Sequence, residues 1–362
     1  MYAVHIMMYK LNPLSTAFNL TITSHIYIGH QSMERSEVIP SKLWNLDWLH
    51  SQTGNCRGRN TVIAIIDGGV DITHNFLSAK YQAQQIFGCN FVPHIDPLTN
   101  TLLIDPNKWY GQDAQDPHGT AVAAIAGGYS YGVAPDAILY ICRIFHNGKM
   151  CASLLHPLEH LLELKTSGKL PIDIISMSLG TDSDKEDIER LLPRLTEQGI
   201  VCVAAVGNKG LYQQGAQFPA SDLNVLSIGA LRPLGPESDL NPSTGVDVFA
   251  PGEDIVCPLM SPGSTVLFDG TSFATPMVAG FISLLLQCAK ELPGSTAKVV
   301  AKYHDLRFLK QLFLNPHSGP CKDKKLIYAE KFLTDIINRP VDINGRNTIV
   351  SLITAVYPEF QP

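Results

Sequence analysis

From residue 61 onward the sequence alternates short apolar runs, rich in β-branched side chains, with amphipathic segments. Apolar runs of this length are typical of strands buried on both faces. Five such strands are predicted, at residues 61–66, 137–144, 173–178, 200–206 and 224–230. Because strands separated by helices pair through crossover connections, the alternation predicts an α/β fold: a mostly parallel sheet with helices on both faces, in three layers.

Two of the intervening segments carry a helical pattern. Five leucines between residues 154 and 165 share one face of a predicted helix. A second helix is predicted over residues 184–198, with Ser183 or Asp184 as its N-cap and Gly199 just past its end. The sequence contains no internal repeat and no low-complexity linker, so we expect one large domain with short appendages.

Charge and hydropathy exclude two classes of function. The 362 residues carry 33 acidic and 27 basic side chains, a net charge of −6, whereas proteins that bind phosphate backbones present a basic face. The longest nearly apolar run, residues 277–286, is about half of the roughly 20 residues that a membrane-spanning helix requires. We therefore expect neither a nucleic-acid partner nor a membrane span.

The eight cysteines form no C-x-x-C pair and no zinc-site spacing with histidine. Cys142, Cys202 and Cys288 lie in apolar stretches, where a free thiol behaves as a small hydrophobic side chain. An even count permits disulfides, but reduced thiols in a reducing compartment are favoured. Residues 1–9 are apolar without a preceding basic region, so we predict a cytoplasmic protein, or one exported without a classical signal peptide.

Three polar side chains stand where ligand sites of α/β sheets lie. Asp67 follows the first predicted strand, His118 opens a helix of small residues, and Ser272 precedes an apolar helix. Asn208 follows a fourth strand. Each residue alone has an ordinary structural explanation, as a turn former or a helix cap. Four coincidences in one chain are a poorer explanation than one site.

Together these residue types suit acyl transfer. That chemistry needs a nucleophile, a base to take its proton, and an acid to hold the base in one tautomer, for which Ser272, His118 and Asp67 are the candidates. A serine at a helix start also places backbone N–H groups toward a developing oxyanion, and the Asn208 amide is a further donor.

At these motifs the chain resembles the subtilisin-like serine peptidases, the subtilase family. The carrying segments are residues 65–71, 116–120, 204–208 and 270–276, in the order Asp, His, Asn, Ser. The serine segment is not a G-x-S-x-G nucleophile elbow, which argues against an esterase. The resemblance implies the subtilisin-like three-layer fold and a serine endopeptidase that hydrolyses peptide bonds through an acyl-enzyme intermediate.

Further stretches that resemble the family, residues 132–135, 248–252 and 325–329, set the expected domain limits. The peptidase domain is predicted over residues 41–337, after an N-terminal extension at 1–40 and before a C-terminal tail at 338–362 that we expect to pack on the domain. The oligomeric state is not predicted.

The resemblance also implies which segments contact a protein or peptide substrate. The residue before the scissile bond would be flanked by two runs, Ser178, Leu179, Gly180 and Ala205, Val206, Gly207. Gln217 is a candidate for the base of that subsite. Neither run contains an acidic residue, which argues against strict selection of basic residues.

The sequence departs from the family at three positions. Gly68 follows the candidate acid where most members have serine or threonine, and Phe273 follows the candidate nucleophile where many have methionine. Phe76 stands where secreted members often have a calcium-binding aspartate. We therefore predict no metal and no cofactor, with structural calcium left without an identified site. His156 and His160 lack the HExxH glutamate, so a solvated helix face is expected there rather than zinc.

Two alternatives use the same fold differently. The first is a catalytically silent subtilase-fold protein used for binding, since a fold does not imply an activity. The second is a precursor-processing peptidase or transpeptidase, in which an amine replaces water as the acceptor of the acyl group. A fluorophosphonate probe distinguishes the first alternative, and mass spectrometry of products distinguishes the second.

Overall fold

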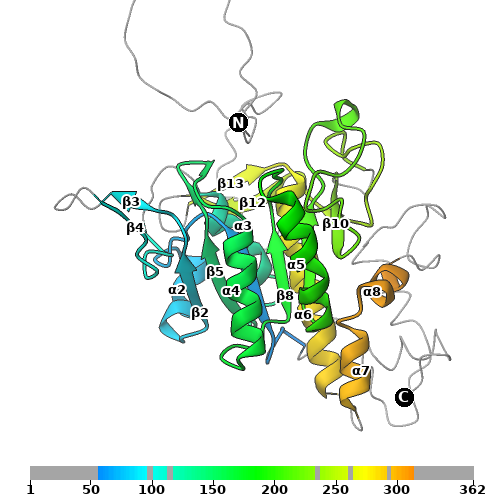
Figure 1. The fold of residues 1–362 in the computed structure, drawn as a ribbon, viewed down its shortest axis with the longest axis horizontal. Coiled ribbons are helices and arrows are strands. Elements are labelled where there is room, and N and C mark those ends of the chain that lie inside the picture. Colours follow the sequence, from blue (N-terminus) through cyan, green and yellow to red (C-terminus); the bar gives the residue numbers. More distant parts are fainter. Residues whose placement is uncertain are drawn as a thin grey trace, which may run out of the picture.

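The computed structural model describes residues 56–95, 101–111, 117–232, 237–259, 264–291 and 295–313. The predicted N-terminal extension, the closing stretch at 325–329 and the C-terminal tail lie outside these residues, as does Asp116. A seven-stranded sheet runs through the middle of the described chain, with helices packed on both sides (Figure 1).

Every strand pair of this sheet is parallel. The order across it is β11 (Val248–Pro251), β10 (Val225–Leu231), β9 (Val201–Ala205), β8 (Ile174–Met177), β1 (Val62–Asp67), β5 (Ile138–Arg143), β2 (Ile86–Asn90). All five strands predicted from apolar runs are confirmed. Strand order changes direction beside β1, so the carboxyl ends of the central strands form the edge where a site is expected.

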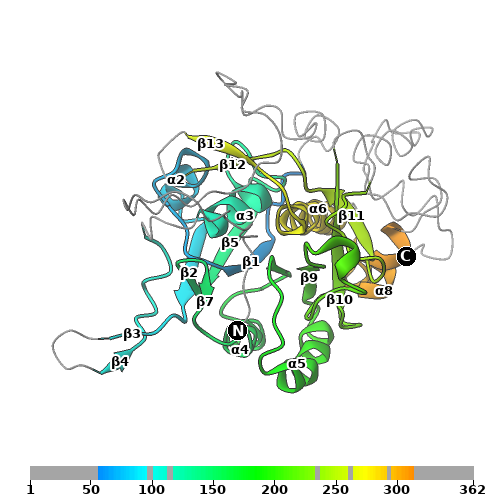
Figure 2. The same cartoon turned by 90° about the horizontal axis from the view of Figure 1, so that it is seen from above.

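Alternate residues of β1 face two different cores. Ile63 and Ile65 pack in a core with α3 (His118–Gly127) and α6 (Thr271–Glu291). Val62, Ala64 and Ile66 pack in the other core, with α4 (Leu155–Thr166) and α5 (Lys185–Glu197). Figure 2 shows the two helix layers on opposite sides of the sheet. Burial on both faces explains why the strands read as continuous apolar runs, and it confirms the α/β three-layer prediction.

Smaller elements surround the sheet. The helices are α2 (Asn75–Gln82), the 3-10 turn η2 (Gly210–Tyr212), α7 (Ala297–Lys302) and α8 (Leu306–Phe313). Three two-stranded hairpins pair β3 (His94–Ile95) with β4 (Leu102–Leu103), β6 (Phe145–His146) with β7 (Lys149–Met150), and β12 (Ile255–Pro258) with β13 (Thr265–Phe268).

The predicted helices at 154–165 and 184–198 are confirmed as α4 and α5. Asp184 is the N-cap of α5, but its side chain accepts a 2.5 Å hydrogen bond from Ser153 rather than capping the helix. Gly199 lies just past the end of α5 with φ of +68°, a conformation that favours glycine.

Helix α6 is longer than its apolar run suggested. By length and composition it could cross a membrane, yet 94% of its most apolar window is buried inside the domain. Two of its buried polar residues bind the chain segment that leads into β1. Gln287 Oε1 accepts from the backbone N–H groups of residues 57–59, at 2.7 to 2.9 Å, and Ser283 Oγ lies 2.5 Å from Thr61 Oγ1. It is the core helix of this domain.

The same contact corrects the prediction of reduced thiols. Cys56 is joined to Cys288 in a disulfide whose Cα atoms lie 6.1 Å apart. The binding of residues 57–59 to Gln287 brings Cys56 beside Cys288, although 232 positions separate them in the sequence. Cys142 and Cys202 are buried free thiols, as predicted.

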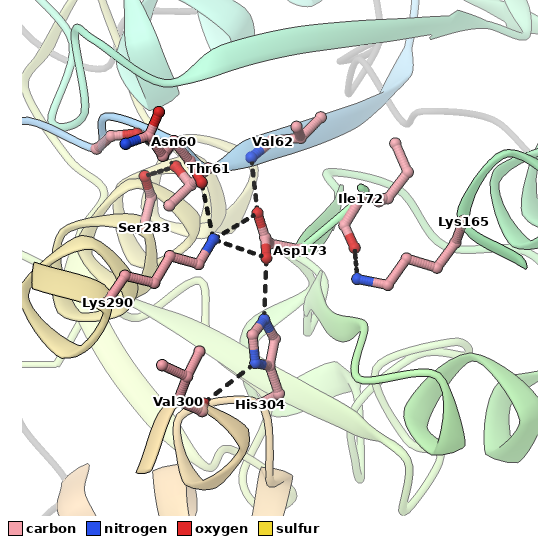
Figure 3. Close-up of polar contacts among 11 residues, drawn as sticks. Asn60, Thr61, Val62, Lys165, Ile172, Asp173, Ser283, Lys290, Val300 and His304 are labelled. Atoms are coloured by element: carbon pink, nitrogen blue, oxygen red, sulfur yellow. Dashed lines mark hydrogen bonds and ion pairs between the residues drawn. The ribbon is translucent and has the colours of Figure 1, made fainter. Parts of the chain in front are cut away.

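A polar cluster closes the amino-terminal end of the sheet (Figure 3). The carboxylate of Asp173, just before β8, accepts from Val62 N at 3.0 Å, from Lys290 Nζ at 3.2 Å and from His304 Nε2 at 3.0 Å. The other ring nitrogen of His304 lies 3.2 Å from Val300 O. This cluster fastens the end of α6 and the α7–α8 connection to the sheet.

Candidate active site

Asp67 ends β1 at the carboxyl edge of the sheet, and its side chain is buried. Its Oδ1 accepts a 2.7 Å hydrogen bond from the backbone N–H of Gly68. The residue that lacks a hydroxyl in this chain therefore still supplies a donor to the carboxylate, through its backbone.

His118 is the first residue of α3, and its Nδ1 lies 2.9 Å from Asp67 Oδ1 and 3.0 Å from Oδ2. The approach depends on Gly119. A Cβ atom there would lie 2.6 Å from Gly69 O and 2.8 Å from the Gly68 carbonyl carbon, closer than such contacts allow. Because position 119 has no side chain, the start of α3 rests directly on the turn that follows Asp67.

Ser272 is the second residue of α6, which packs against α3. The ring of the next residue, Phe273, lies 5.6 Å from the His118 ring, centroid to centroid. Asp67 of β1 and His118 of α3 therefore contact each other, and Ser272 of α6 directly precedes a residue whose ring lies near His118.

Ser272 is hydrogen-bonded to Ser178, just after β8, because a proline in α6 leaves the Ser272 carbonyl free. Pro276 lies four residues after Ser272 in α6 and has no N–H to donate to the Ser272 carbonyl. The hydroxyl of Ser178 donates to that carbonyl instead, at 2.7 Å, and Ser272 Oγ lies 3.4 Å from Ser178 O. The predicted substrate segment and the predicted nucleophile therefore contact each other directly.

Asn208 follows β9 and is oriented by Thr271. Its Oδ1 accepts from the backbone N–H and the hydroxyl of Thr271, both at 2.9 Å. Because the amide oxygen faces Thr271, the Nδ2 donor faces elsewhere, near Gly270, where a Cβ atom would lie 3.2 Å from it. The position suits a donor to an oxyanion formed at Ser272.

The two predicted substrate runs end β8 and β9, which are neighbouring strands. Gln217 lies between them: Cβ atoms at Gly180 and Gly207 would lie 2.5 Å from its Oε1 and 3.0 Å from its Cδ. Gln213 lies beside it, a buried residue that sequence reasoning missed. A glutamine in a polar loop carries no motif, so its only sequence signal was nearness to Gln217.

One acid beside the site has a raised pKa. Asp269 lies on the surface, three residues before Ser272, and its pKa is raised by partial desolvation of the carboxylate and by the charges of Glu253 and Asp254. A backbone hydrogen bond from Asp254, at 2.7 Å, acts in the opposite direction without reversing the shift. Asp269 is therefore protonated more readily than an aspartate with an ordinary pKa.

Within the described parts of the chain, no group of three His, Cys, Asp or Glu side chains could hold a metal ion. Phe76, which matches the family's calcium-binding position, is buried and stacks on Tyr131 at 4.2 Å. His156 is exposed as predicted, but His160 is not on a solvated face: its Nε2 lies 2.7 Å from the Tyr140 hydroxyl, and burial lowers its pKa.

Known proteins with similar sequences are proteases. The family model described as the subtilase family matches residues 58–316. Subtilisin-like protease 3 of Pseudogymnoascus destructans is 29% identical over 292 residues, which cover 76% of this chain and 67% of that protein. The intracellular serine protease of Paenibacillus polymyxa is 30% identical over 241 residues, covering 64% of this chain and 68% of that protein.

Solved structures agree on the fold. The protease domain of PatA has a TM-score of 0.57 at 26% identity, covering 78% of this chain and 97% of that chain. The prenylagaramide maturation protease PagA has a TM-score of 0.56 at 23% identity, covering 86% of this chain and 98% of that chain. Since the family model spans most of the sequence, the chain belongs to the subtilase family and is a subtilisin-like serine protease, a hydrolase that acts on peptides.

Proposed function

We propose that this protease is an endopeptidase in which Ser272 is the nucleophile, His118 the general base and Asp67 the acid that orients it. Asp67 holds the proton of His118 on Nδ1, so that Nε2 is the nitrogen that takes the proton from Ser272 Oγ. The oxygen of Ser272 then attacks the scissile carbonyl carbon and forms the acyl-enzyme as the amine leaves with that proton.

The oxyanion of each tetrahedral intermediate would be held by the Nδ2 of Asn208 and the backbone N–H of Ser272. Both are fixed before the reaction: Thr271 anchors the amide oxygen of Asn208, and Ser272 lies in the first turn of α6. Donors that need no rearrangement stabilise charge better than mobile ones. The positive end of the α6 dipole adds to this effect.

One observation carries the proposal most strongly. Both oxygens of a buried carboxylate contact the same nitrogen of His118, at 2.9 and 3.0 Å, while the helix that carries His118 packs on the helix that begins with Thr271 and Ser272. A histidine that merely capped α3 would not need a buried carboxylate behind it.

We further propose that the residue before the scissile bond lies between Ser178, Leu179, Gly180 and Ala205, Val206, Gly207. The hydrogen bond from Ser178 Oγ to Ser272 O supports the first run. The hydrogen bond from Gly207 N to Thr271 Oγ1, at 3.3 Å, supports the second.

A fluorophosphonate probe tests the nucleophile. We expect covalent labelling of the folded protein, loss of labelling in Ser272→Ala, and full labelling in the matched control Ser167→Ala, an exposed serine at the end of α4. Absence of labelling in folded wild type, together with binding of peptides without cleavage, would instead identify a silent binding protein.

Water is the proposed acyl acceptor. The neighbour named as a maturation protease is similar at 23% identity, a level that carries the fold alone, so hydrolysis remains the simpler proposal. Mass spectrometry of peptide products tests it: cyclic or transferred products in place of free carboxyl termini would identify a transpeptidase.

Domain limits and compartment are also proposals. The match to the family model over residues 58–316 supports a peptidase domain at 41–337. Two relatives named as intracellular proteases support a cytoplasmic enzyme, whereas the Cys56–Cys288 disulfide is typical of oxidising compartments. Thiol counting on protein taken from its native source decides between them: eight free thiols support the cytoplasm, and a lower count supports export.

A further inference from the structure

We propose that Gln213 and Gln217 act as a pair that selects substrates with a side-chain amide, glutamine foremost, on the residue before the scissile bond. This inference rests on the proposed function, since it assigns the substrate class of the same site. The side chains of the two glutamines are called the amide pair below.

The amide pair lies where the side chain of a bound substrate would enter. Ser178 contacts Ser272, and Gly207 contacts Thr271, so both runs that lead to the amide pair start at the proposed nucleophile. A peptide whose carbonyl carbon is held at Ser272 directs its neighbouring side chain between these runs, toward Gln217.

The Gln217 side chain lies between Gly180 and Gly207. Its backbone N–H donates to Val206 O at 3.0 Å, which fixes its position. Its Oε1 lies toward Gly180 and its Cδ toward Gly207, at the short distances given above. The side chain is only partly buried, and no hydrogen bond of its amide is found among the described residues. A polar group in this position is available to a substrate.

Gln213 lies beside Gln217, and its own amide is held in one orientation. Its Nε2 donates to Val206 O at 2.6 Å and to Gly215 O at 2.7 Å, and two carbonyl partners fix which end of the amide is nitrogen. Its Oε1 is buried without a partner in the described chain. A Cβ at Gly207 would lie 2.6 Å from that oxygen and 3.0 Å from Gln217 Cδ, so both amides border Gly207.

An unpartnered buried acceptor favours a donor beside it. The Gln217 oxygen lies on the Gly180 side, where it can accept a hydrogen bond from a substrate side chain. The N–H₂ group of a substrate side-chain amide is a neutral donor that can bind the Gln217 oxygen. The substrate-facing runs and the amide pair contain no charged residue, so a lysine or glutamate side chain would be desolvated without a counter-charge. An apolar side chain would leave the amide oxygen unpaired.

The test uses peptides that differ only in the residue before the scissile bond: glutamine, methionine of similar shape, glutamate and lysine. We expect the wild-type kcat/KM for glutamine to exceed that for methionine by about tenfold or more. Gln217→Met is expected to reverse this order, and Gln213→Met to weaken it. Gln214→Met, an exposed glutamine of the same loop, is the matched control and should keep the wild-type order.

Labelling by the fluorophosphonate probe is measured on every variant. If wild type is labelled but cleaves the methionine or lysine peptide as well as the glutamine peptide, or cleaves none of the four, the amide preference is wrong while the proposed function stands. An unchanged order in labelled Gln217→Met also refutes it. If wild type is not labelled at Ser272, the proposed function itself fails.

Discussion

Two buried aspartates each hold a histidine, at opposite ends of the same strand. Asp67 ends β1 and contacts His118, while Asp173 accepts from the first N–H of β1 and contacts His304. The N···O distances are nearly equal, 2.9 and 3.0 Å. The paired residue types are therefore the same, and their surroundings separate the two sites.

We call Asp67 and His118 the upper pair and Asp173 and His304 the lower pair. The lower pair attaches elements of the fold to each other. Both ring nitrogens of His304 face acceptors, and Lys290 adds a cation to the same carboxylate. The His304 side chain is 12% exposed, whereas that of His118 is 29% exposed. A histidine committed to two acceptors cannot take a proton from a substrate. A carboxylate–histidine pair therefore becomes a candidate for catalysis only with a serine and an open edge beside it.

The largest expected effect is a loss of kcat that occurs on substitution of His118 and not of His304. His118→Ala should lower kcat by at least about 10⁴-fold, because the proposed base is lost; in subtilisin, a family relative, removing this residue type costs about 2 × 10⁶. The thermal midpoint should change little. His304→Ala and the exposed control His156→Ala should keep the kcat of the folded enzyme. Comparable losses of kcat in His118→Ala and His304→Ala would break the distinction.

The next effect tests what surrounds the upper pair. Asn208→Leu keeps the shape of the side chain and removes its donor, so kcat should fall by about 10²–10³ with little change in KM. That range comes from an oxyanion asparagine of subtilisin itself, so it is borrowed from the family. Steady-state kinetics on one good peptide measures it. A KM effect without a kcat effect would assign Asn208 to substrate binding.

The lower pair should affect stability instead. Asp173→Asn leaves Lys290 and His304 without a carboxylate, and because both side chains retain some solvent we expect a loss of about 2 kcal/mol in the free energy of unfolding. Urea denaturation measures it. The labelling rate of Ser272 should be unchanged in the folded fraction. Asp182→Asn, at an exposed position before α5, serves as the control.

The same carboxylate predicts a pH dependence. Burial raises the pKa of Asp173, but the His304 hydrogen bond and the charge of Lys290 outweigh it and leave the pKa below 3.8. A lowered pKa in the folded state stabilises the protein above the unfolded value and is lost as the pH falls through the folded value. The stability difference between wild type and Asp173→Asn should therefore be constant at neutral pH and shrink below about pH 3.8. A difference that grows with acidification would contradict this sign.

The smallest effect concerns the turn after Asp67. Gly68→Ser restores the hydroxyl common in the family, and a Cβ there would meet Gly119 N at 3.8 Å and Gly119 Cα at 3.9 Å, both ordinary contacts. Since the backbone N–H of residue 68 already donates to Asp67, we expect kcat to change by less than about threefold. Gly119→Ala is the contrasting variant, because its Cβ would collide with backbone. Equal behaviour of the two variants would contradict this account of the turn.

Much of the upper site could be predicted because its residues stand at strand and helix ends in a recognisable order. The strands of the sheet interior are apolar on both faces, which makes them visible as runs. Strand β2 was not predicted: it lies at the sheet edge, and Phe87 within it is 41% exposed, so its sequence lacks an apolar run. Helix α6 looked shorter than it is because Ser283 and Gln287 interrupt its apolar pattern while remaining buried.

The lower cluster and the disulfide could not be predicted from sequence. Asp173 lies 117 positions from Lys290 and 131 from His304, and the three residues follow no motif, since they attach elements rather than perform shared chemistry. Cys56 meets Cys288 only because Gln287 binds the segment that follows Cys56. Contacts between distant segments of this kind depend on the packed helices, which local patterns do not encode.

Helix α6 carries Ser272 in its first turn and Lys290 in its last, so one continuous rod joins the two regions compared above. Its 21 residues span roughly 30 Å, and each residue turns the helix by about 100°. Deleting or inserting a single residue between these ends would therefore rotate the serine away from the histidine whenever the lower anchor held. The number of residues between Ser272 and Lys290 is thus constrained by the rotation of the helix. Burial of apolar surface alone would not impose this constraint.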